Sequence, residues 1–165
     1  MKLSVIFLLF FLGAFHCATV HAQTTPETKM CPDLTSIVTI LPSVFASISQ
    51  IQIAIEVSEL NGTATNGSSI IVRIPFDSRI TFINNPPLPS TSNWAYQGNN
   101  GLVHYFFYKG GIFPAGTTDA FLLNTLYDPQ NTDGHTSISS SVVPFSGGEC
   151  NVQNNSDSEW VVYYD

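Results

Sequence analysis

The most constraining feature of this sequence is a segment in which branched aliphatic residues occupy every second position. The apolar positions are Ile51, Ile53, Ile55 and Val57, and the residues between them are polar or small. A period of two places these four side chains on one face of an extended strand, whereas a helix would distribute them around its circumference. The segment therefore predicts a β-strand with one buried face and one face toward solvent.

The rest of the chain shows further short strands separated by turn signals. Apolar or alternating segments recur at residues 34–40, 70–74, 80–83, 94–97, 102–108, 120–127, 136–145 and 159–164. Asn61-Gly62 and Asn66-Gly67 are typical turn dipeptides, because Asn and Gly accept the positive φ that tight turns require. Ten prolines spread along the chain argue against a helical bundle. We therefore predict an all-β fold, an immunoglobulin-like antiparallel β-sandwich of seven to nine strands, with a jelly roll as the alternative.

Residues 1–22 have the pattern of a secretory signal peptide. Lys2 supplies the positive start, residues 3–15 form an apolar run too short to span a bilayer, and Val20-His21-Ala22 fits a cleavage site. Residues 23–30 predict a polar tether, and residues 31–165 predict one folded domain. No second apolar stretch approaches the roughly 20 residues of a membrane helix, so we expect no transmembrane segment in the mature chain. The expected location is the medium or the cell surface, with the periplasm as the alternative.

The charge of the chain limits the class of partner. Five Lys and Arg against twelve Asp and Glu give a formal net charge of -7 at pH 7. This is the wrong sign for binding a phosphate backbone, so we expect no nucleic acid as a partner. Only 10% of the residues are charged, which predicts a surface of hydroxyl and amide groups. A protein or a surface glycan is the partner class that remains.

The cysteines predict one disulfide. Cys17 lies inside the signal peptide, so the mature chain keeps Cys31 and Cys150, which have only each other as partners. We predict a structural bridge between them, because an exported protein reaches an oxidising compartment and the two residues fall at one end of an immunoglobulin-like sandwich. Two free thiols are the alternative. Neither cysteine has the basic surroundings of a catalytic thiol.

Candidate catalytic and metal-binding groups are sparse. In the mature chain only His104 and His135 supply imidazole groups, and no Gly-x-Ser-x-Gly motif supplies a nucleophile. Residues 128–134 and 154–159 carry several side-chain oxygens, but Pro129 interrupts the ligand spacing of a calcium loop in the first of these segments. Asp and Asn in such segments ordinarily form turns with the backbone. We therefore expect no enzymatic activity, no cofactor and no metal.

Aromatic residues are the best functional lead. Trp94, Tyr96, Tyr105 and Phe107 lie in two neighbouring segments, and a core of this size does not hold every aromatic ring. We predict that part of this set is exposed as a contact surface for a sugar ring or another protein. The alternative is that both strands are central and buried on both faces. Trp160 in the final segment raises the same question, because a terminal strand at a sheet edge can pair with another chain.

Several short stretches resemble those of a known family. They are Cys31-Pro32-Asp33-Leu34-Thr35, Glu59-Leu60-Asn61, residues 70–75, Pro114-Ala115-Gly116, Ser146-Gly147-Gly148-Glu149 and residues 154–159. In combination they are similar to the conserved immunoglobulin-like repeat domain of bacterial surface and secreted proteins, especially those of Bacteroidetes. The resemblance covers most of the mature chain and implies a sandwich of seven or more strands in an exported protein. It carries over no catalytic residue.

These observations together predict a function. The expected protein is an exported, non-enzymatic adhesion or protein-interaction module of a bacterial surface or secreted protein, and the main warrant for this is analogy of fold. A carbohydrate-binding module that uses exposed aromatic residues is the alternative.

Overall fold

The computed structural model describes residues 30–84, 86–90 and 93–164. The predicted signal peptide at residues 1–22 and nearly all of the predicted tether at residues 23–30 lie outside the described residues. The strands are β1 (Leu34–Leu41), β2 (Val44–Ala46), β3 (Ser49–Glu59), β4 (Ile71–Pro75), β5 (Ile80–Phe82), β6 (Trp94–Asn99), β7 (Val103–Tyr108), β8 (Thr118–Tyr127), β9 (Gly134–Val142) and β10 (Ser156–Tyr164). A short 3-10 turn, η1 (Ser146–Gly148), lies between β9 and β10.

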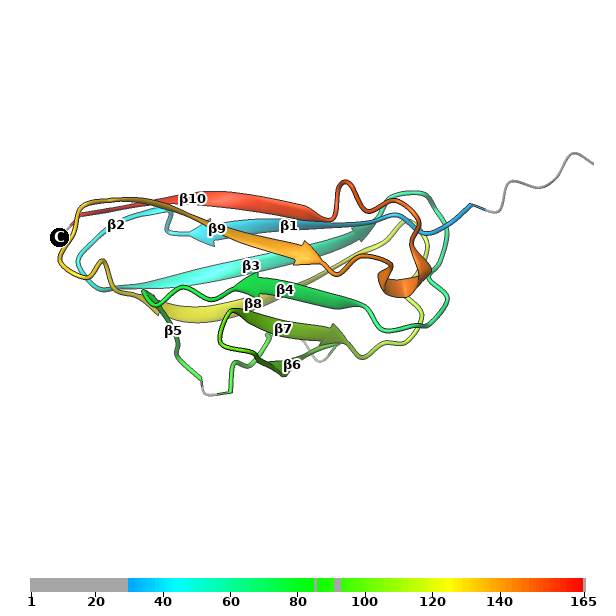
Figure 1. Ribbon diagram of the computed structural model, residues 1–165, viewed down its shortest axis with the longest axis horizontal. Helices are drawn as coiled ribbons and strands as arrows, with labels where there is room; N and C mark the ends of the chain where they lie inside the picture. Colours follow the sequence, from blue (N-terminus) through cyan, green and yellow to red (C-terminus); the bar gives the residue numbers. More distant parts are fainter. Residues whose placement is uncertain (1–29, 85, 91–92, 165) are drawn as a thin grey trace, which may run out of the picture.

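The strands form two sheets that stack as a sandwich (Figure 1). One sheet has four strands in the order β1-β3-β8-β5, and the other has six in the order β2-β10-β9-β4-β7-β6. The paired strands are antiparallel except for β2, which runs parallel to β10. The predicted all-β sandwich of antiparallel strands is therefore confirmed.

The alternating segment forms the centre of the four-stranded sheet. In β3 the side chains of Ile51, Ile53, Ile55 and Val57 are at most 1% exposed. Ile53 pairs with Leu123 and Ile55 pairs with Phe121 on β8, and these partners are equally buried. Burial of each such side chain contributes about 1.5 to 3 kcal/mol. The period of two thus supplies one half of the core.

Predicted and observed strands differ at two places. Val44–Ala46 is too short to show a period, so the sequence pattern does not reveal β2, which brings the number of strands to ten. β9 ends at Val142 rather than at Phe145. The reason is that Pro144 lacks an amide hydrogen and Phe145 has a left-handed φ of 66°, which turns the chain out of the sheet.

Gly147 belongs to one of the sequence stretches that carry the family resemblance, and the backbone geometry explains why this position is a glycine. Its φ is +63°, and a Cβ atom built there would lie 2.7 Å from Cγ2 of Thr65. The close approach lets Gly147 O accept a hydrogen bond of 2.9 Å from the amide of Asn66. Only glycine meets both requirements, so this residue fixes how η1 packs against the loop before β4.

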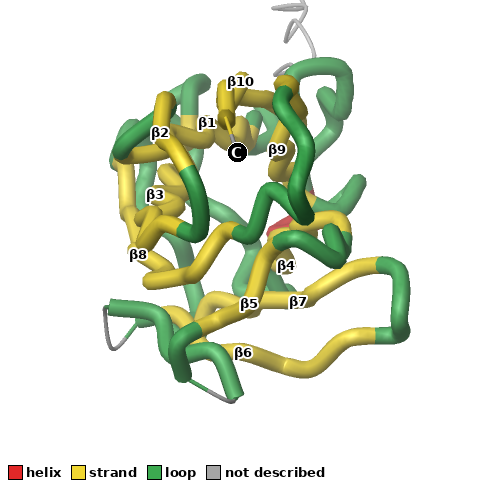
Figure 2. The backbone as a smooth tube through the Cα atoms, turned by 90° about the vertical axis from the view of Figure 1, so that its left-hand side faces the viewer, coloured by secondary structure: helices red, strands yellow, loops and turns green. Residues whose placement is uncertain are grey.

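Strand β1 covers one long side of the sandwich, where it packs against β9 and β10 of the other sheet (Figure 2). Ser36 Oγ and Ser140 Oγ lie 2.6 Å apart across the two sheets, and both residues are buried. The amide of Val38 donates to Asp157 Oδ2 at 3.0 Å, so a carboxylate from β10 satisfies an amide on the edge of β1. On the opposite side, β5 faces β6 and β7 (Figure 2).

The predicted disulfide between Cys31 and Cys150 is confirmed. The two Cα atoms are 5.7 Å apart, and the bridge spans a sequence separation of 119 residues. Beside it, Asn154 Nδ2 donates to Asp33 Oδ1 at 2.9 Å. Covalent and polar contacts therefore fasten the loop before β10 to the start of β1.

Glu59, the last residue of β3, is a buried carboxylate that accepts four backbone hydrogen bonds. The donors are the amides of Asp33 (3.3 Å), Asn61 (3.0 Å), Thr63 (3.1 Å) and Gly116 (2.7 Å). Burial alone raises the pKa of this carboxyl, but the four amides outweigh burial and hold its pKa below the usual range. The charged form of Glu59 therefore holds together three segments at the disulfide end.

Glu149 is equally buried but incompletely paired. Its Oε1 accepts hydrogen bonds from Asn155 Nδ2 and from the amide of Phe145 (3.2 Å), whereas Oε2 has no partner among the described residues. Burial raises the pKa of this carboxyl above its usual range, although hydrogen bonds from the Asn155 side chain and from the backbone of Phe145 and Leu34 oppose the shift. The nearby charge of Asp33 adds to the increase. The charged form of Glu149 therefore lowers the stability of the folded state, whereas the charged form of Glu59 does not.

The disulfide generates a first prediction. The double substitution Cys31→Ser/Cys150→Ser is expected to lower the free energy of unfolding by about 4 to 5 kcal/mol, because the bridge closes a long loop in the unfolded chain. Guanidinium denaturation of the oxidised wild type and the double variant measures the difference. Equal midpoints would contradict the prediction, as would an intact mass that shows two free thiols in protein purified without reductant.

The two buried glutamates generate a second prediction. Glu59→Gln places an amide nitrogen against backbone donors, and we expect a loss of about 2 to 4 kcal/mol at pH 7. Glu149→Gln keeps the oxygen that accepts both hydrogen bonds and removes the charge, so its stability is expected to be higher than that of the wild type or within about 1 kcal/mol of it. Chemical denaturation of both variants checks the contrast.

The contributions of Glu59 and Glu149 to stability depend on pH in opposite directions. The folded pKa of Glu59 lies below the unfolded value of about 4.3, so its stabilisation is complete above that pH and is lost as the pH falls through the folded pKa. The folded pKa of Glu149 lies above about 4.3, so its contribution is complete below that pH and is lost as the pH rises through the folded pKa. The measurement is the free energy of unfolding as a function of pH for the wild type, Glu59→Gln and Glu149→Gln. A change of the pH dependence in the same direction in both variants would contradict this assignment.

Candidate functional site

A cleft of about 330 Å³ lies between the open edges of the two sheets, where β5 faces β6 and β7. Phe82 of β5 lines it from the four-stranded sheet, and Tyr96 of β6 and His104 of β7 line it from the six-stranded sheet. Phe76, which directly follows β4 and donates its amide to Leu102 O, also lines the cleft. The lining includes the hydroxyl and amide side chains of Ser78, Thr81, Asn84 and Asn99. No aspartate, glutamate, lysine or arginine lines the cleft in the described part of the chain.

His104 lies at the meeting point of the aromatic rings. The residue is 8% exposed, and the centre of its ring is 4.9 Å from that of Phe82, 5.8 Å from that of Phe76 and 6.0 Å from that of Tyr96. β7 places it on the inner face because its neighbour two positions along, Phe106, is fully buried. Burial lowers the pKa of the imidazole below its usual range, since the charged form loses water. His104 is therefore neutral at pH 7.

A short relay of hydrogen bonds joins Asn99, Tyr96 and this imidazole. Asn99 Nδ2 donates to the hydroxyl oxygen of Tyr96 at 3.0 Å, and that oxygen lies 3.2 Å from His104 Nδ1. All three groups are paired when the Tyr96 hydroxyl donates its hydrogen to Nδ1. Nε2 then carries the ring hydrogen, and it has no hydrogen-bond partner among the described residues.

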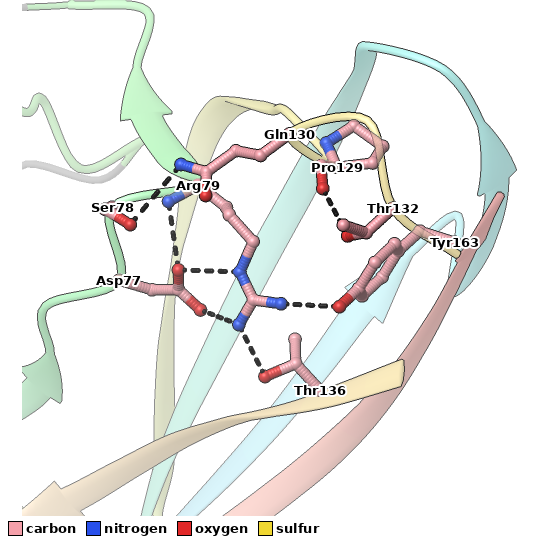
Figure 3. Close-up of polar contacts among 8 residues, drawn as sticks. All are labelled: Asp77, Ser78, Arg79, Pro129, Gln130, Thr132, Thr136 and Tyr163. Atoms are coloured by element: carbon pink, nitrogen blue, oxygen red, sulfur yellow. Dashed lines mark hydrogen bonds and ion pairs between the residues drawn. The ribbon is translucent and has the colours of Figure 1, made fainter. Parts of the chain in front are cut away.

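Arg79, between the cleft residues Ser78 and Ile80 in the sequence, forms a cluster of polar contacts (Figure 3). Its guanidinium binds both carboxylate oxygens of Asp77, with Nε to Oδ1 at 3.0 Å and Nη2 to Oδ2 at 2.8 Å. It also donates to the Tyr163 hydroxyl at 2.6 Å and to Thr136 Oγ1 at 2.9 Å. The guanidinium carbon lies 5.6 Å from the ring centre of Tyr127 and 5.4 Å from that of Tyr163. The hydrogen bonds therefore join the segment before β5 to β9 and β10, across the two sheets.

The electrostatics of this cluster favour its charged state. Burial raises the pKa of Asp77, but the hydrogen bonds and charge of Arg79 hold it below the usual range. The hydrogen bond to Asp77 raises the pKa of Arg79 in turn. Burial raises the pKa of the Tyr127 hydroxyl, which keeps that group neutral beside the ion pair. Because the pair is only partly exposed and doubly hydrogen-bonded, it is stronger than an isolated surface ion pair.

The structure separates the four aromatic residues that the sequence singles out. Trp94 is 2% exposed and packs between Tyr108 and Phe121, so it belongs to the core and the prediction of a contact role for it is wrong. Tyr96 borders the cleft. Tyr105 and Phe107 point outward from β7, where they are partly exposed.

Tyr105 and Phe107 belong to a wider outer face of the six-stranded sheet. Cross-strand pairing sets Arg73 beside Tyr105 and Ile71 beside Phe107. Further along the same face, Trp160 on β10 is 59% exposed and its ring centre lies 5.0 Å from that of His135. The stretch between these aromatic ends carries serine side chains, namely Ser137, Ser139, Ser141, Ser156 and Ser158.

The candidate calcium segments have structural roles at several positions. Asp128 Oδ1 accepts from the amide of Gln130 at 2.8 Å, which is the backbone turn expected for it. Asn154 binds Asp33, and Asp157 binds the edge of β1. Across residues 30–84, 86–90 and 93–164, no three His, Cys, Asp or Glu side chains gather as a metal site would require. The same residues include no helix with the length and hydropathy of a membrane span.

Sequence reasoning misses the cleft and its supporting cluster. Phe82 comes from the four-stranded sheet, whereas Tyr96 and His104 come from the six-stranded sheet, so only the packing of the two sheets brings them together. Asp77 and Arg79 are close in sequence, which suggests a local pair. The Tyr163 partner lies 84 residues away and leaves no sequence signal.

Comparisons with known proteins support the fold. No protein-family model and no curated protein matches the chain. Among solved structures, a cohesin module from a Clostridium perfringens family 33 glycoside hydrolase is similar with a TM-score of 0.58 and 10% identity, over 81% of this chain and 98% of that chain. The CARDB domain of a Pyrococcus furiosus protein, in complex with di-metal ions, is similar with a TM-score of 0.53 and 18% identity, over 81% of this chain and 90% of that one.

Both similar structures are immunoglobulin-like β-sandwich modules, so the fold that the family resemblance implies is confirmed. At such low identity the likeness shows the fold alone. The particular link to Bacteroidetes stays a prediction.

The Arg79 cluster generates a third prediction. Arg79→Lys keeps the charge but cannot bind both oxygens of Asp77 and the hydroxyls of Tyr163 and Thr136 together, so we expect a loss of about 1 to 3 kcal/mol in unfolding free energy. Chemical denaturation measures this loss. Arg73→Lys, at a position with no ion pair among the described residues, is the matched control and is expected to change stability less. A larger loss in the control would overturn the role assigned to Arg79.

Proposed function

We propose that this chain is a non-enzymatic module that binds a partner protein, as an adhesion or interaction domain of a bacterial surface or secreted protein. The observation that carries the proposal is the outer face of the six-stranded sheet, which displays Trp160, Tyr105, Phe107 and Arg73. Trp, Tyr and Arg are the residues most enriched in the energetic centres of protein interfaces. A rigid sheet presents them without the entropic cost of ordering a loop.

The charge of this face indicates what the partner offers. Arg73 Nε is buried without a hydrogen-bond partner among the described residues, although the chain carries a net charge of -7. Tyr105 lies beside Arg73 on the next strand. The Arg73 side chain as a whole is partly exposed on this face, so its positive charge can pair with a carboxylate or carbonyl oxygen of a partner, and the serine side chains along the face supply further hydrogen bonds. The arrangement therefore favours an acidic or polar protein surface as the partner.

Export is part of the same proposal. The predicted signal peptide at residues 1–22 directs the chain out of the cytoplasm. The disulfide between Cys31 and Cys150 is of the kind that persists in an oxidising compartment. Secretion or display on the cell surface is therefore the location that we propose, with the periplasm as the alternative.

Carbohydrate binding is the second candidate function. Of the four aromatic residues proposed for it, Tyr96 is the one that borders a cleft of ligand size. Tyr105 and Phe107 lie on the protein-contact face, and Trp94 is in the core. Carbohydrate binding therefore depends on the cleft and not on an exposed aromatic strip.

The proposed contact face generates a fourth prediction. Immobilised wild-type domain is expected to capture a defined protein from the medium or surface extract of the cells that produce it, and Tyr105→Ser/Phe107→Ser is expected to weaken capture by about thirty-fold or more. The matched control is Leu41→Ser/Leu126→Ser, which removes exposed apolar side chains from the four-stranded sheet instead. Thermal unfolding confirms that both variants are folded.

The outcome that would contradict the proposal is equally specific. Capture of the same proteins by wild type and the Tyr105→Ser/Phe107→Ser variant would exclude this face as the contact surface. Loss of capture on addition of free methyl glycosides would assign the interaction to glycans in place of a protein.

A further inference from the structure

The cleft between β5 and β6–β7 has the dimensions of a site for one ring. Its volume of about 330 Å³ is at the lower end of the range of small-ligand pockets. None of its described lining residues carries a formal charge at pH 7, and Asp77 and Arg79, which flank the lining residue Ser78 in the sequence, form an ion pair with each other. A neutral ligand of one ring therefore fits the cleft better than an anion, a cation or a long chain.

The lining of the cleft combines aromatic rings with polar side chains. Phe76 and Phe82 offer apolar surface, and Ser78, Thr81, Asn84 and Asn99 offer hydroxyl and amide groups. A ligand that matches this arrangement has an apolar face and several hydroxyl groups at its circumference. A pyranose has that form, because its axial hydrogens make an apolar face and its hydroxyls project from the rim. A plain aromatic ring would leave the surrounding amides without partners.

His104 supplies an imidazole group to the lining of the cleft. When the Tyr96 hydroxyl, which accepts from Asn99, donates its hydrogen to Nδ1, the ring hydrogen of His104 is on Nε2. The side-chain hydrogen bond of this imidazole uses Nδ1 and leaves Nε2 available. An N–H group that borders a cleft can donate to an acceptor there, such as a ligand hydroxyl or ring oxygen.

We propose that this cleft binds one neutral pyranose ring, which packs against Phe76 and Phe82 and accepts a hydrogen bond from His104 Nε2. Tyr96 and Asn99 act as positioning residues, since they hold the imidazole in the tautomer that donates to the sugar. The site is distinct from the outer face proposed for protein contact, and it deepens the carbohydrate alternative by naming the ligand class and the residues.

The test is a titration of the isotope-labelled domain followed by NMR. The probes are the methyl glycosides of glucose, galactose, mannose and N-acetylglucosamine, with phenol as the competing aromatic ring. At least one glycoside is expected to give saturable shifts that are largest at the amides of Phe76, Phe82, Tyr96 and His104. Long-range nitrogen spectra of the His104 side chain are expected to show the hydrogen on Nε2 before the sugar is added.

Matched variants then locate the interaction. Tyr96→Phe keeps the ring but breaks the relay, so it is expected to weaken glycoside binding by roughly three- to ten-fold. Asn99→Ala provides a second test of the relay from an exposed position and is expected to weaken binding in the same direction. Tyr164→Phe removes a hydroxyl from an exposed tyrosine remote from the cleft and is expected to leave binding unchanged.

Several outcomes would overturn the proposal. They are saturable binding of phenol with no response to any glycoside, no response to any probe, glycoside shifts confined to the outer face of the six-stranded sheet, and unchanged affinity in both Tyr96→Phe and Asn99→Ala. The Tyr105→Ser/Phe107→Ser variant separates this result from the proposed protein contact. It is expected to lose protein capture while it keeps glycoside binding, so each proposal fails by its own measurement.

Discussion

Burial of one face of β3 is the constraint on which the rest of the structure depends. Ile51, Ile53, Ile55 and Val57 leave almost no surface to solvent, and a single sheet has no means of burying them alone. The six-stranded sheet covers them with residues such as Val161 and Phe106, which are also fully buried. Every other feature, from the disulfide to the cleft, follows from the need to stack two sheets over this row of side chains.

The two sheets are closed on one side and open on the other, and this asymmetry places the candidate site. β1 closes its side through Ser36, Val38 and the disulfide end, where polar and covalent contacts cross between the sheets. On the other side β5 is only three residues long, so it leaves room between its edge and β6–β7. Arg79 braces that open side from one end by joining the segment before β5 to β9 and β10. The cleft therefore results from the short edge strand of the four-stranded sheet. Aromatic side chains from both sheets line it.

Local pattern predicts the strands of this protein far better than it predicts the site. The strict alternation in β3 and the turn dipeptides at Asn61 and Asn66 are local signals, and the strands that they imply are present. The pairing of Cys31 with Cys150 follows from arithmetic, because the third cysteine, Cys17, falls inside the predicted signal peptide. By contrast, Trp94 looks like a surface aromatic until its partners Tyr108 and Phe121 are known. The cleft and the four-fold pairing of Glu59 require contacts between distant segments, and no period or motif records them.

Native-state hydrogen exchange measured amide by amide tests the central claim most directly, which is that the sandwich is anchored at β3 and open at β5–β6. Amides in the paired β3 and β8 strands are expected to exchange only through global unfolding, because they lie at the base of the core. Amides of β5 and β6 are expected to exchange through local opening at a lower free energy. Equal protection on both sides of the sandwich, or early exchange in β3, would contradict the account.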